Sequence, residues 1–385
     1  MRSKKISTLI IIALFAVNFI FGQNYFNRKI GLTEKNFISS SDNAIINYFP
    51  SISNKNGFMY GKLNYDNDYM MTLNLNISRY SFDISNYVKT TDTITYDIMP
   101  EFRYMNMTDF IFGYKARRWQ YSLGLSFSNS SFGGDSGNVG LNDLVYIGGI
   151  GSSLSSGEKT VDFNMGIKVE KLTCSRNING NISKNDNRPG YELNIMATIK
   201  DGENIFDIYI LGSSNAFNFL YNDSIAVYNG EEIYSTRYTI NPGISWSRSY
   251  ADFADIRLNA SYFYSSFDVQ TYDNSGDTGV VRQKEQFLPR ISYQININLY
   301  KNIYTSIFGN YKYKIVENNV NSKKTLEKEP KFLYNVGVGY NNGDVSVIVG
   351  GERLIENILQ SFQNGKFNIP LQLRFYYHLD NISGV

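Results

Sequence analysis

Short stretches in which apolar and polar residues alternate recur along most of this chain, and they limit the fold more than any other feature of the sequence. The clearest lies at 161–170 and reads VDFNMGIKVE. Further stretches of this kind lie at 69–78, 119–128, 254–264, 287–299 and 367–379. Successive side chains of a β-strand point to opposite faces. Each stretch therefore predicts a strand with one apolar face and one polar face.

The length of these stretches and the aromatic residues at their ends favour strands that cross a lipid bilayer. Several reach the roughly 9–11 residues that a tilted strand needs to cross the hydrocarbon layer, and Trp119, Tyr191 and Tyr300 stand at ends, as in the aromatic girdles of membrane barrels. The mean hydropathy of −0.30, with 19% charged residues and 31 Tyr, fits strands between lipid and water. The alternative, a secreted β-sandwich with one wet face, should have shorter strands with more Val and fewer Tyr. We therefore predict an all-β, transmembrane, antiparallel up-and-down β-barrel.

The connections between the alternating stretches predict the orientation and size of the barrel. From about residue 119, long polar segments (129–142, 173–189, 214–231, 268–285, 317–330 and 354–366) alternate with short ones (155–159, 202–203, 249–252, 301–302 and 342–344). Barrels of this type have short periplasmic turns and long extracellular loops. This part predicts twelve strands. Windows near 57–65, 69–82, 94–104 and 109–117 add two long strands or four short ones, so we expect 14 strands, with 16 as the alternative.

The N-terminus predicts export. Basic Arg2, Lys4 and Lys5 precede an apolar run at 6–21, which is the pattern of a secretory signal peptide. We place the signal peptide at 1–22; an uncleaved anchor is the alternative. Residues 23–55 do not alternate and are expected to form a periplasmic or hatch-like segment, and 56–380 the barrel. The predicted location is the outer membrane of a bacterium with two membranes.

Residues for catalysis or transition-metal binding are scarce. The sequence has one His, His378, and one Cys, Cys174, whereas a Ser-His-acid triad needs a His and metal sites favour clusters of His and Cys. We expect no enzyme activity, no cofactor and no metal. The run at 148–153, GGIGSS, lacks the Lys of a phosphate-binding loop. It predicts a strand where the barrel bends or where something packs closely inside.

Charged residues on the polar strand faces are the candidates for a functional lumen. They carry both signs, and the basic ones that we expect to face the lumen are Arg103, Lys168, Arg237, Arg257, Arg290 and Arg374. One interpretation is a wet transport lumen that attracts anionic head groups. The other is a set of salt bridges that brace the interior. Overall, 37 basic residues nearly balance 35 acidic ones, so no nucleic acid is expected as a partner.

Three further segments resemble the FadL-type outer-membrane transporters of long-chain fatty acids and other hydrophobic compounds. Asp42, Ala44 and Pro50 fit the Asp-x-Ala…Asn-Pro-Ala frame of that family's hatch, although Phe49 replaces its Asn and Ser51 its last Ala. Residues 141–144 (LNDL) and the segment beginning at 240 (INPGISW) are similar to strand openers and hairpins of the family. The resemblance implies a 14-strand barrel, an N-terminus that plugs it, and lateral release of an apolar ligand.

Together these observations predict a barrel that passes small molecules, hydrophobic ones among them, by facilitated diffusion. The expected partners are outer-membrane lipid, a small hydrophobic or anionic ligand, and the barrel-assembly machinery during biogenesis. Two alternatives remain: a surface antigen or adhesin that binds partners through its long extracellular loops, and a structural subunit of an envelope or secretion complex.

Overall fold

The computed structural model describes 49–51, 58–64, 69–90, 104–134, 137–178, 181–186, 189–221, 231–250, 253–272, 278–320, 323–343, 345–364 and 371–379. The predicted signal peptide (1–22), the hatch candidates Asp42 and Ala44, and the lumen candidate Arg103 lie outside these residues.

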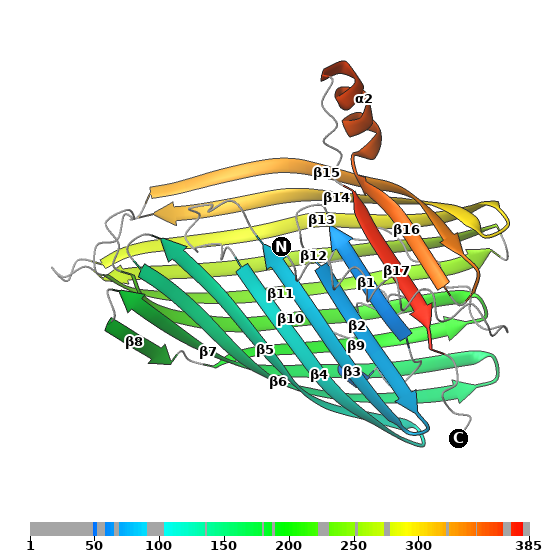
Figure 1. Ribbon diagram of the computed structural model, residues 1–385, viewed down its shortest axis with the longest axis horizontal. Helices are drawn as coiled ribbons and strands as arrows, with labels where there is room; N and C mark the ends of the chain where they lie inside the picture. Colours follow the sequence, from blue (N-terminus) through cyan, green and yellow to red (C-terminus); the bar gives the residue numbers. More distant parts are fainter. Residues whose placement is uncertain are drawn as a thin grey trace, which may run out of the picture.

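One antiparallel sheet closes on itself to form a barrel (Figure 1). The described residues contain seventeen strands. Among them, β8 pairs with the outer end of β7 alone, so sixteen strands form the ring. Seven paired positions between β1 and β17 close it. The strands are β1 (Phe58–Asn64), β2 (Tyr69–Ile77), β3 (Tyr80–Thr90), β4 (Tyr104–Ala116), β5 (Trp119–Gly134), β6 (Gly137–Ser156), β7 (Lys159–Ile178), β8 (Asn181–Asp186), β9 (Gly190–Asp201), β10 (Asn204–Tyr221), β11 (Glu231–Tyr250), β12 (Ala254–Tyr272), β13 (Thr278–Tyr300), β14 (Ile303–Val320), β15 (Lys323–Asn341), β16 (Val345–Glu352) and β17 (Gln372–His378).

The strand count corrects the expectation of 14 and agrees with the alternative of 16. The expectation of 14 took the four upstream windows as two long strands, but this part of the chain forms β1, β2, β3 and β4. The window 69–82 holds β2 and the start of β3, and most of the window 94–104 lies outside the described residues. Ser78 takes a left-handed conformation (φ 58°) in the tight turn between β2 and β3. Because Gly, Asn and Asp are the usual residues at such positions, Ser78 and Arg79 give no turn signal. The upstream windows therefore supply four strands.

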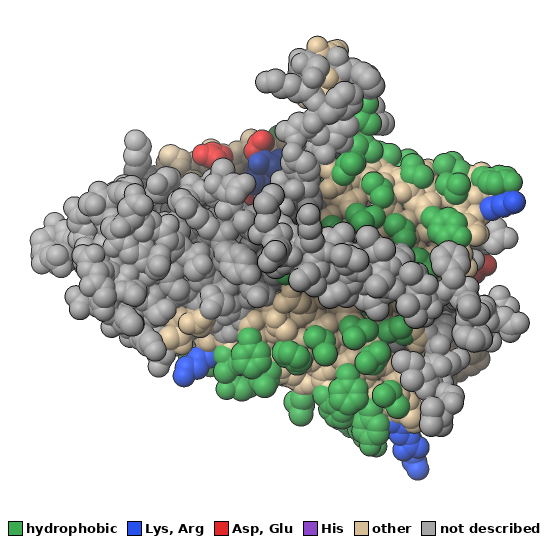
Figure 2. All heavy atoms as spheres, in the orientation of Figure 1, with side chains coloured by type: hydrophobic (Ala, Val, Ile, Leu, Met, Phe, Trp, Pro, Cys, Tyr) green, Lys and Arg blue, Asp and Glu red, His purple; other side chains and the backbone are tan. Residues whose placement is uncertain are grey.

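The two faces of the strands differ as the alternation predicts. On β7, Asp162 and Asn164 are buried, whereas Val161 and Phe163 are each 42% exposed. On β5, Leu123 is 72% exposed, while Ser122 is 3% exposed. Figure 2 shows hydrophobic side chains covering the visible outer surface near the turn end of the barrel. The apolar face therefore points outward and the polar face inward.

The outer apolar surface has the height of a bilayer. On β15, the outward side chains are apolar or aromatic over nine residues and then give way to the exposed Pro330 and Lys328. Nine residues are about the number that a tilted strand needs to cross the hydrocarbon layer. A closed ring also leaves no unpaired strand edge in lipid. The chain is thus an outer-membrane β-barrel, and its apolar belt on β15 consists of Phe332, Tyr334, Val336, Val338 and Tyr340.

Helix contributes little to the described part of the chain. The helix α2 (Leu354–Asn364) lies between β16 and β17. No helix among the described residues is long and apolar enough to span a membrane.

Short turns lie where the sequence places them, but the expected long loops are largely strand. Tight turns occur at 157–158, 202–203 and 301–302. At the other end, β5 runs to Gly134 and β6 begins at Gly137, inside the predicted loop 129–142. Predicted loops 173–189, 214–231, 268–285 and 317–330 are likewise partly or mostly strand, and 354–366 contains α2. The polar composition of these segments suggested loops, but backbone pairing between strands continues into their described parts.

As a result, the barrel has walls of unequal height (Figure 1). The strands beside its closure contain seven to nine residues each: β1, β2, β16 and β17. We call these four strands the low seam. Strands β10 to β15 contain eighteen to twenty-three residues each. We call these six strands the tall wall. Because the low seam has about the length that crosses the membrane, the outer half of the tall wall stands beyond it.

Candidate functional site

The inner wall is polar and closely hydrogen-bonded. Asp207 of β10 accepts hydrogen bonds from Thr198 Oγ1 at 2.7 Å and from Ser245 Oγ at 2.7 Å. Asn74 Nδ2 donates to Asp83 Oδ2 at 3.4 Å on β2 and β3. Buried polar groups without such partners would be costly. The wall therefore holds its polar side chains in a network across neighbouring strands.

The structure places four of the six lumen candidates on this inner wall. Lys168 Nζ lies 3.3 Å from Glu192 Oε1. Arg257 Nη1 donates to Gln294 Oε1 at 3.5 Å, and Arg374 Nη2 to Gln372 Oε1 at 3.3 Å. Arg290 is 3% exposed. They lie on four different strands, β7, β12, β13 and β17, and Lys168, Arg257 and Arg374 each contact a different partner. Of the other two candidates, Arg237 lies on β11 but its side chain, like the whole of Arg103, is outside the described residues.

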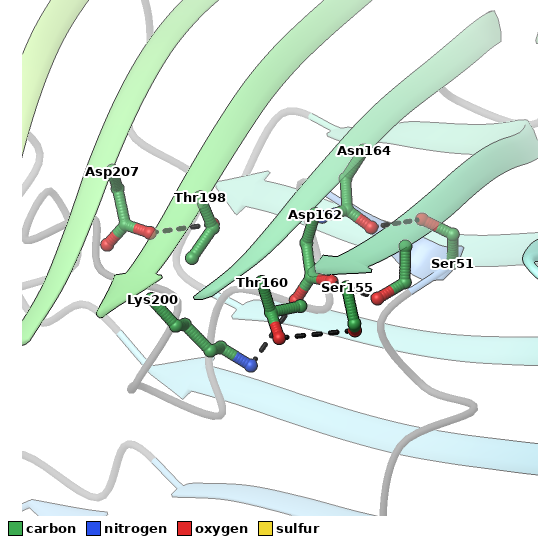
Figure 3. A network of polar contacts seen from close by, with 9 residues as sticks. Ser51, Ser155, Thr160, Asp162, Asn164, Thr198, Lys200 and Asp207 are labelled. Atoms are coloured by element: carbon green, nitrogen blue, oxygen red, sulfur yellow. Dashed lines mark hydrogen bonds and ion pairs between the residues drawn. The ribbon is translucent and has the colours of Figure 1, made fainter. Parts of the chain in front are cut away.

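A short N-terminal segment, Phe49–Ser51, packs against the inner wall, and we call it the lumen segment. Ser51 Oγ donates to Asn164 Oδ1 at 3.1 Å (Figure 3). A Cβ atom added at Gly149 would lie 3.2 Å from Cγ of Pro50, and one added at Gly151 would lie 3.1 Å from Oγ of Ser51. The glycines of β6 thus make room for the lumen segment. This confirms the interpretation of the glycine-rich run as a place of close internal packing.

Phe49 lies in an apolar cluster on the otherwise polar inner wall, and we call it the inner cluster. Phe49 and Tyr376 are 0% and 1% exposed. The rings of Phe58 and Tyr376 stack with centroids 5.5 Å apart. The Tyr209 hydroxyl accepts a hydrogen bond from Asn259 Nδ2 at 2.9 Å, which satisfies the polar end of a buried ring. The inner cluster consists of Phe49, Phe58, Ile111, Ile147, Met196, Tyr209 and Tyr376.

The inner cluster was not predicted from the sequence, although the sequence contains a signal for it. Met196 stands between Asn194 and Thr198 in the polar register of β9. Ile111 similarly follows Asp109 in the polar register of β4. Apolar residues at polar positions of a barrel strand indicate an internal apolar contact, because the inner face otherwise meets water or polar groups.

A cavity of about 350 Å³ opens at the turn end of the barrel, and we call it the mouth pocket. Asp162 Oδ2 lies 3.3 Å from Lys200 Nζ (Figure 3). Ser153 Oγ donates a hydrogen bond to the other carboxylate oxygen of Asp162. Four cationic side chains and one carboxylate face this cavity. Its lining residues are Lys115, Arg117, Arg118, Gln120, Ser153, Thr160, Asp162 and Lys200.

Metal-binding side chains are not grouped in the part of the chain that the structure describes. No three or more His, Cys, Asp or Glu residues come together there in a way that could hold a metal ion.

Comparisons with known proteins reach the level of the fold only. No protein-family model matches the chain, and no curated protein matches it. Among solved structures, the chain is similar to the ferric yersiniabactin uptake receptor FyuA from Yersinia pestis (12% identity, TM-score 0.44, covering 77% of this chain and 54% of that one). It is also similar to CdiB from Escherichia coli (7% identity, TM-score 0.43, covering 83% and 62%) and to the copper transporter OprC (9% identity, TM-score 0.33, covering 83% and 79%). The chain thus spans less than two thirds of the length of the first two, and none of their functions is carried over to it.

Proposed function

We propose that this barrel passes small molecules, with hydrophobic ones among them, across the outer membrane by facilitated diffusion. In this proposal, the lumen segment belongs to a hatch that occupies the passage, as the resemblance to FadL-type transporters implies. The observation that carries the proposal is the inner cluster, in which a phenylalanine from outside the strands is fully buried against a polar-walled lumen.

The energetics of the inner cluster suit a reversible closure. Burial of a phenylalanine side chain stabilises a contact by roughly 1.5–3 kcal/mol. The hydrogen bond from Ser51 to Asn164 adds roughly 0.5–1.5 kcal/mol. These contributions hold the lumen segment without making its displacement prohibitive. An apolar solute that binds in place of Phe49 would recover the same hydrophobic contribution, and a solute shifts such an equilibrium only through its preference for the open state.

The chemistry of the site explains why an apolar solute would be accepted. Tyr376, Met196 and Ile147 offer ring, thioether and aliphatic surfaces, whereas the surrounding wall offers amides, hydroxyls and charges. Pockets that bind small molecules commonly combine a large apolar lining with a few polar groups. The proposed role is binding and passage, without a chemical step.

Planar-bilayer conductance and proteoliposome uptake of an apolar fluorescent solute would test the proposal. We expect Phe49→Ala to raise conductance or uptake several-fold, because it removes the ring that holds the lumen segment. The matched control is Phe82→Ala, which removes a lipid-facing phenylalanine that is 44% exposed and should leave both unchanged. Folded wild-type and Phe49→Ala barrels that neither conduct nor take up any solute would overturn the transport proposal.

The tall wall favours one second candidate, a surface antigen or adhesin. Its outer half stands beyond the membrane on the side away from the short turns, where a partner protein could reach it. Shortening the hairpins within 268–285 and 317–330 should then abolish binding of that partner and leave permeability unchanged. A change in permeability without a change in binding would instead support transport.

A further inference from the structure

We propose that the mouth pocket binds a phosphate group at the turn end of the barrel. The proposal does not depend on passage through the lumen. The mouth pocket is lined by the β4–β5 turn and by inward-facing residues at the turn end of β4, β5, β6, β7 and β9, and none of its residues belongs to the inner cluster. The proposal rests on the charge of the cavity, the two adjacent arginines of one turn and the chemistry of the donors.

The mouth pocket has a surplus of positive charge. Its one carboxylate, Asp162, forms an ion pair with Lys200 (Oδ2 to Nζ, 3.3 Å) and accepts a hydrogen bond from Ser153 Oγ. The remaining cations are Lys115, Arg117 and Arg118, and no ion pair joins them to a carboxylate among the described residues. Three cations around one cavity repel each other, and an anion of two or more charges would relieve that repulsion.

The turn that carries Arg117 places two of these cations next to each other. Arg117 and Arg118 form the two-residue turn between β4 and β5, and both line the mouth pocket. The backbone of Arg117 is left-handed (φ 53°), like that of Ser78, Lys301, Gly157 and Gly202 at the first position of the other tight turns. The feature specific to the β4–β5 turn is therefore its pair of guanidinium groups.

The donors fit phosphate in particular. A guanidinium group presents paired N–H donors that match two oxygens of a phosphate, and a lysine adds a compact charge. Gln120 and Thr160 supply neutral donors on the same wall. The phosphate could belong to a soluble compound that enters the mouth or to a phospholipid head group of the inner leaflet, and both present the same chemistry.

Titration of pyrophosphate into the full-length barrel in a phosphate-free detergent, followed by calorimetry, tests this site. We expect Arg117→Gln with Arg118→Gln to weaken binding at least 10-fold and rising salt to weaken it in the wild type. The control is Lys301→Gln, which removes an exposed cation from another tight turn and should leave binding unchanged. Equal binding by both variants, or binding that persists undiminished in high salt, would overturn the proposal.

Nanodiscs distinguish the source of the phosphate. If the natural ligand is a head group, then pyrophosphate should bind in nanodiscs of a phosphate-free neutral lipid and be displaced when phosphatidylglycerol is included. If it is soluble, the two nanodiscs should give the same affinity. Failure to bind pyrophosphate in detergent and in both nanodiscs would reject a phosphate site altogether.

A different set of observations carries a second inference: we infer that α2 lies on the lipid surface of the outer leaflet. The helix follows β16 directly, and the backbone N–H of Arg353 donates to the carbonyl of Tyr334 at 2.9 Å. Tyr334 lies near the outer end of the apolar belt on β15. Only Phe332 of the belt lies between it and Pro330 and Lys328. The helix therefore begins at the level where the lipid-facing surface ends.

The direction and sequence of α2 agree with that level. Figure 1 shows α2 standing away from the barrel wall, crosswise to the strands. Leu354, Ile358 and Leu359 recur at helical spacing, and Leu359 is 57% exposed. The polar Gln360 lies on the other side of the helix and is exposed, whereas Gln363 follows Leu359 at the edge of the apolar side. An amphipathic helix of this kind lies in the membrane interface with its apolar side in the acyl boundary, continuous here with the belt below it.

Fluorescence quenching by brominated lipids tests the seating of α2. The lone native cysteine allows a Cys174→Ser background, into which Leu359→Cys or the matched Gln360→Cys is introduced and labelled with an environment-sensitive dye. We expect brominated lipids in nanodiscs to quench the dye at 359 at least twofold more than at 360. Equal quenching at the two positions, in barrels that migrate as folded on unheated gels, would overturn the inference.

Discussion

The low seam and the tall wall are made of the same kind of strand but meet different surroundings. In the low seam, β16 and β17 pair over six positions and β1 and β17 over seven. In the tall wall, β10 and β11 pair over eighteen. The strands of the low seam therefore lie almost entirely within the membrane, whereas each strand of the tall wall has a lipid-facing half and a water-facing half. Strand length alone does not indicate how much of a barrel is in lipid.

Closure depends on the shorter of these two regions. Every hydrogen bond of the β1–β17 pair supports the ring as a whole, and the pair has few of them. The tall wall has additional backbone hydrogen bonds in its water-facing half, which closure of the ring in the membrane does not need. Disturbances of equal size should therefore cost more at the low seam than in the tall wall.

The largest effect is expected from Gly61→Val in β1. A Cβ atom at Gly61 would lie 2.0 Å from Cε1 of Phe375, directly across the closing pair. Overpacking typically costs about 1–3 kcal/mol and can exceed this, so we expect a loss of roughly 3 kcal/mol or more and little closed barrel. Heat-modifiable gel mobility and urea unfolding in lipid measure it. Gly212→Val in β10 is the control, since a Cβ atom there has its nearest neighbour at 3.7 Å, and an equally severe loss there would break the comparison.

A pair of arginine substitutions on β15 should locate the membrane on the tall wall. Val338 and Leu326 face outward and are 56% and 54% exposed, but Leu326 lies beyond the apolar belt. We expect Val338→Arg to lower the free energy of unfolding in lipid by about 2–4 kcal/mol and Leu326→Arg by about 0–1 kcal/mol. Similar costs at both positions would mean that the outer half of the tall wall is also in lipid.

A smaller cost is expected from Gly243→Ala within the tall wall. A Cβ atom at Gly243 would lie 2.3 Å from the hydroxyl oxygen of Tyr209, whose ring covers this glycine. We expect a loss of about 1–3 kcal/mol, with the barrel still closed because the β10–β11 pair is long. The double variant with Tyr209→Ala should recover part of the loss due to the clash. Open barrels from Gly243→Ala alone would show that the tall wall has no reserve.

The smallest effect belongs to an ion pair beyond the membrane. Lys324 Nζ lies 3.0 Å from Glu317 Oε1, with side chains 60% and 32% exposed. Exposed pairs typically contribute about 0.2–1 kcal/mol. We expect Lys324→Gln to lower the free energy of unfolding by less than about 1 kcal/mol, and less again in 1 M salt because the charges are screened. A larger loss would mean that side-chain charges, rather than backbone pairing, hold up the outer half.

The alternation of residues predicts the barrel and both of its faces, because lipid and water impose a period of two on every crossing strand. The alternation predicts the strands less well where the wall leaves the lipid and has water on both sides. The segments at 129–142 and 268–285 were interpreted as loops because they are polar, and hydrogen bonds between neighbouring strands leave no periodic signal. The turn at Ser78 was missed because neither of its residues favours left-handed backbone.

The candidate site was less predictable than the fold. Lys168 and Arg290 could be assigned to the polar register from the sequence, but their partners depend on which strands are neighbours. The inner cluster joins Phe49 to residues as distant as Met196 and Tyr376, and only closure of the ring brings them together. The mouth pocket likewise draws on the β4–β5 turn and on strands β7 and β9, whose relative register is set by pairing rather than by local sequence.

The position of the lumen segment in the chain has a mechanical consequence. Six residues separate Ser51 from Phe58, the first residue of β1. A chain extends by at most about 3.3–3.6 Å per residue. Ser51 therefore stays within roughly 25 Å of Phe58 in any conformation of the residues between them. If the lumen segment is displaced as proposed, its return is an intramolecular step. Closure by such a hatch would therefore not depend on the concentration of the protein in the membrane.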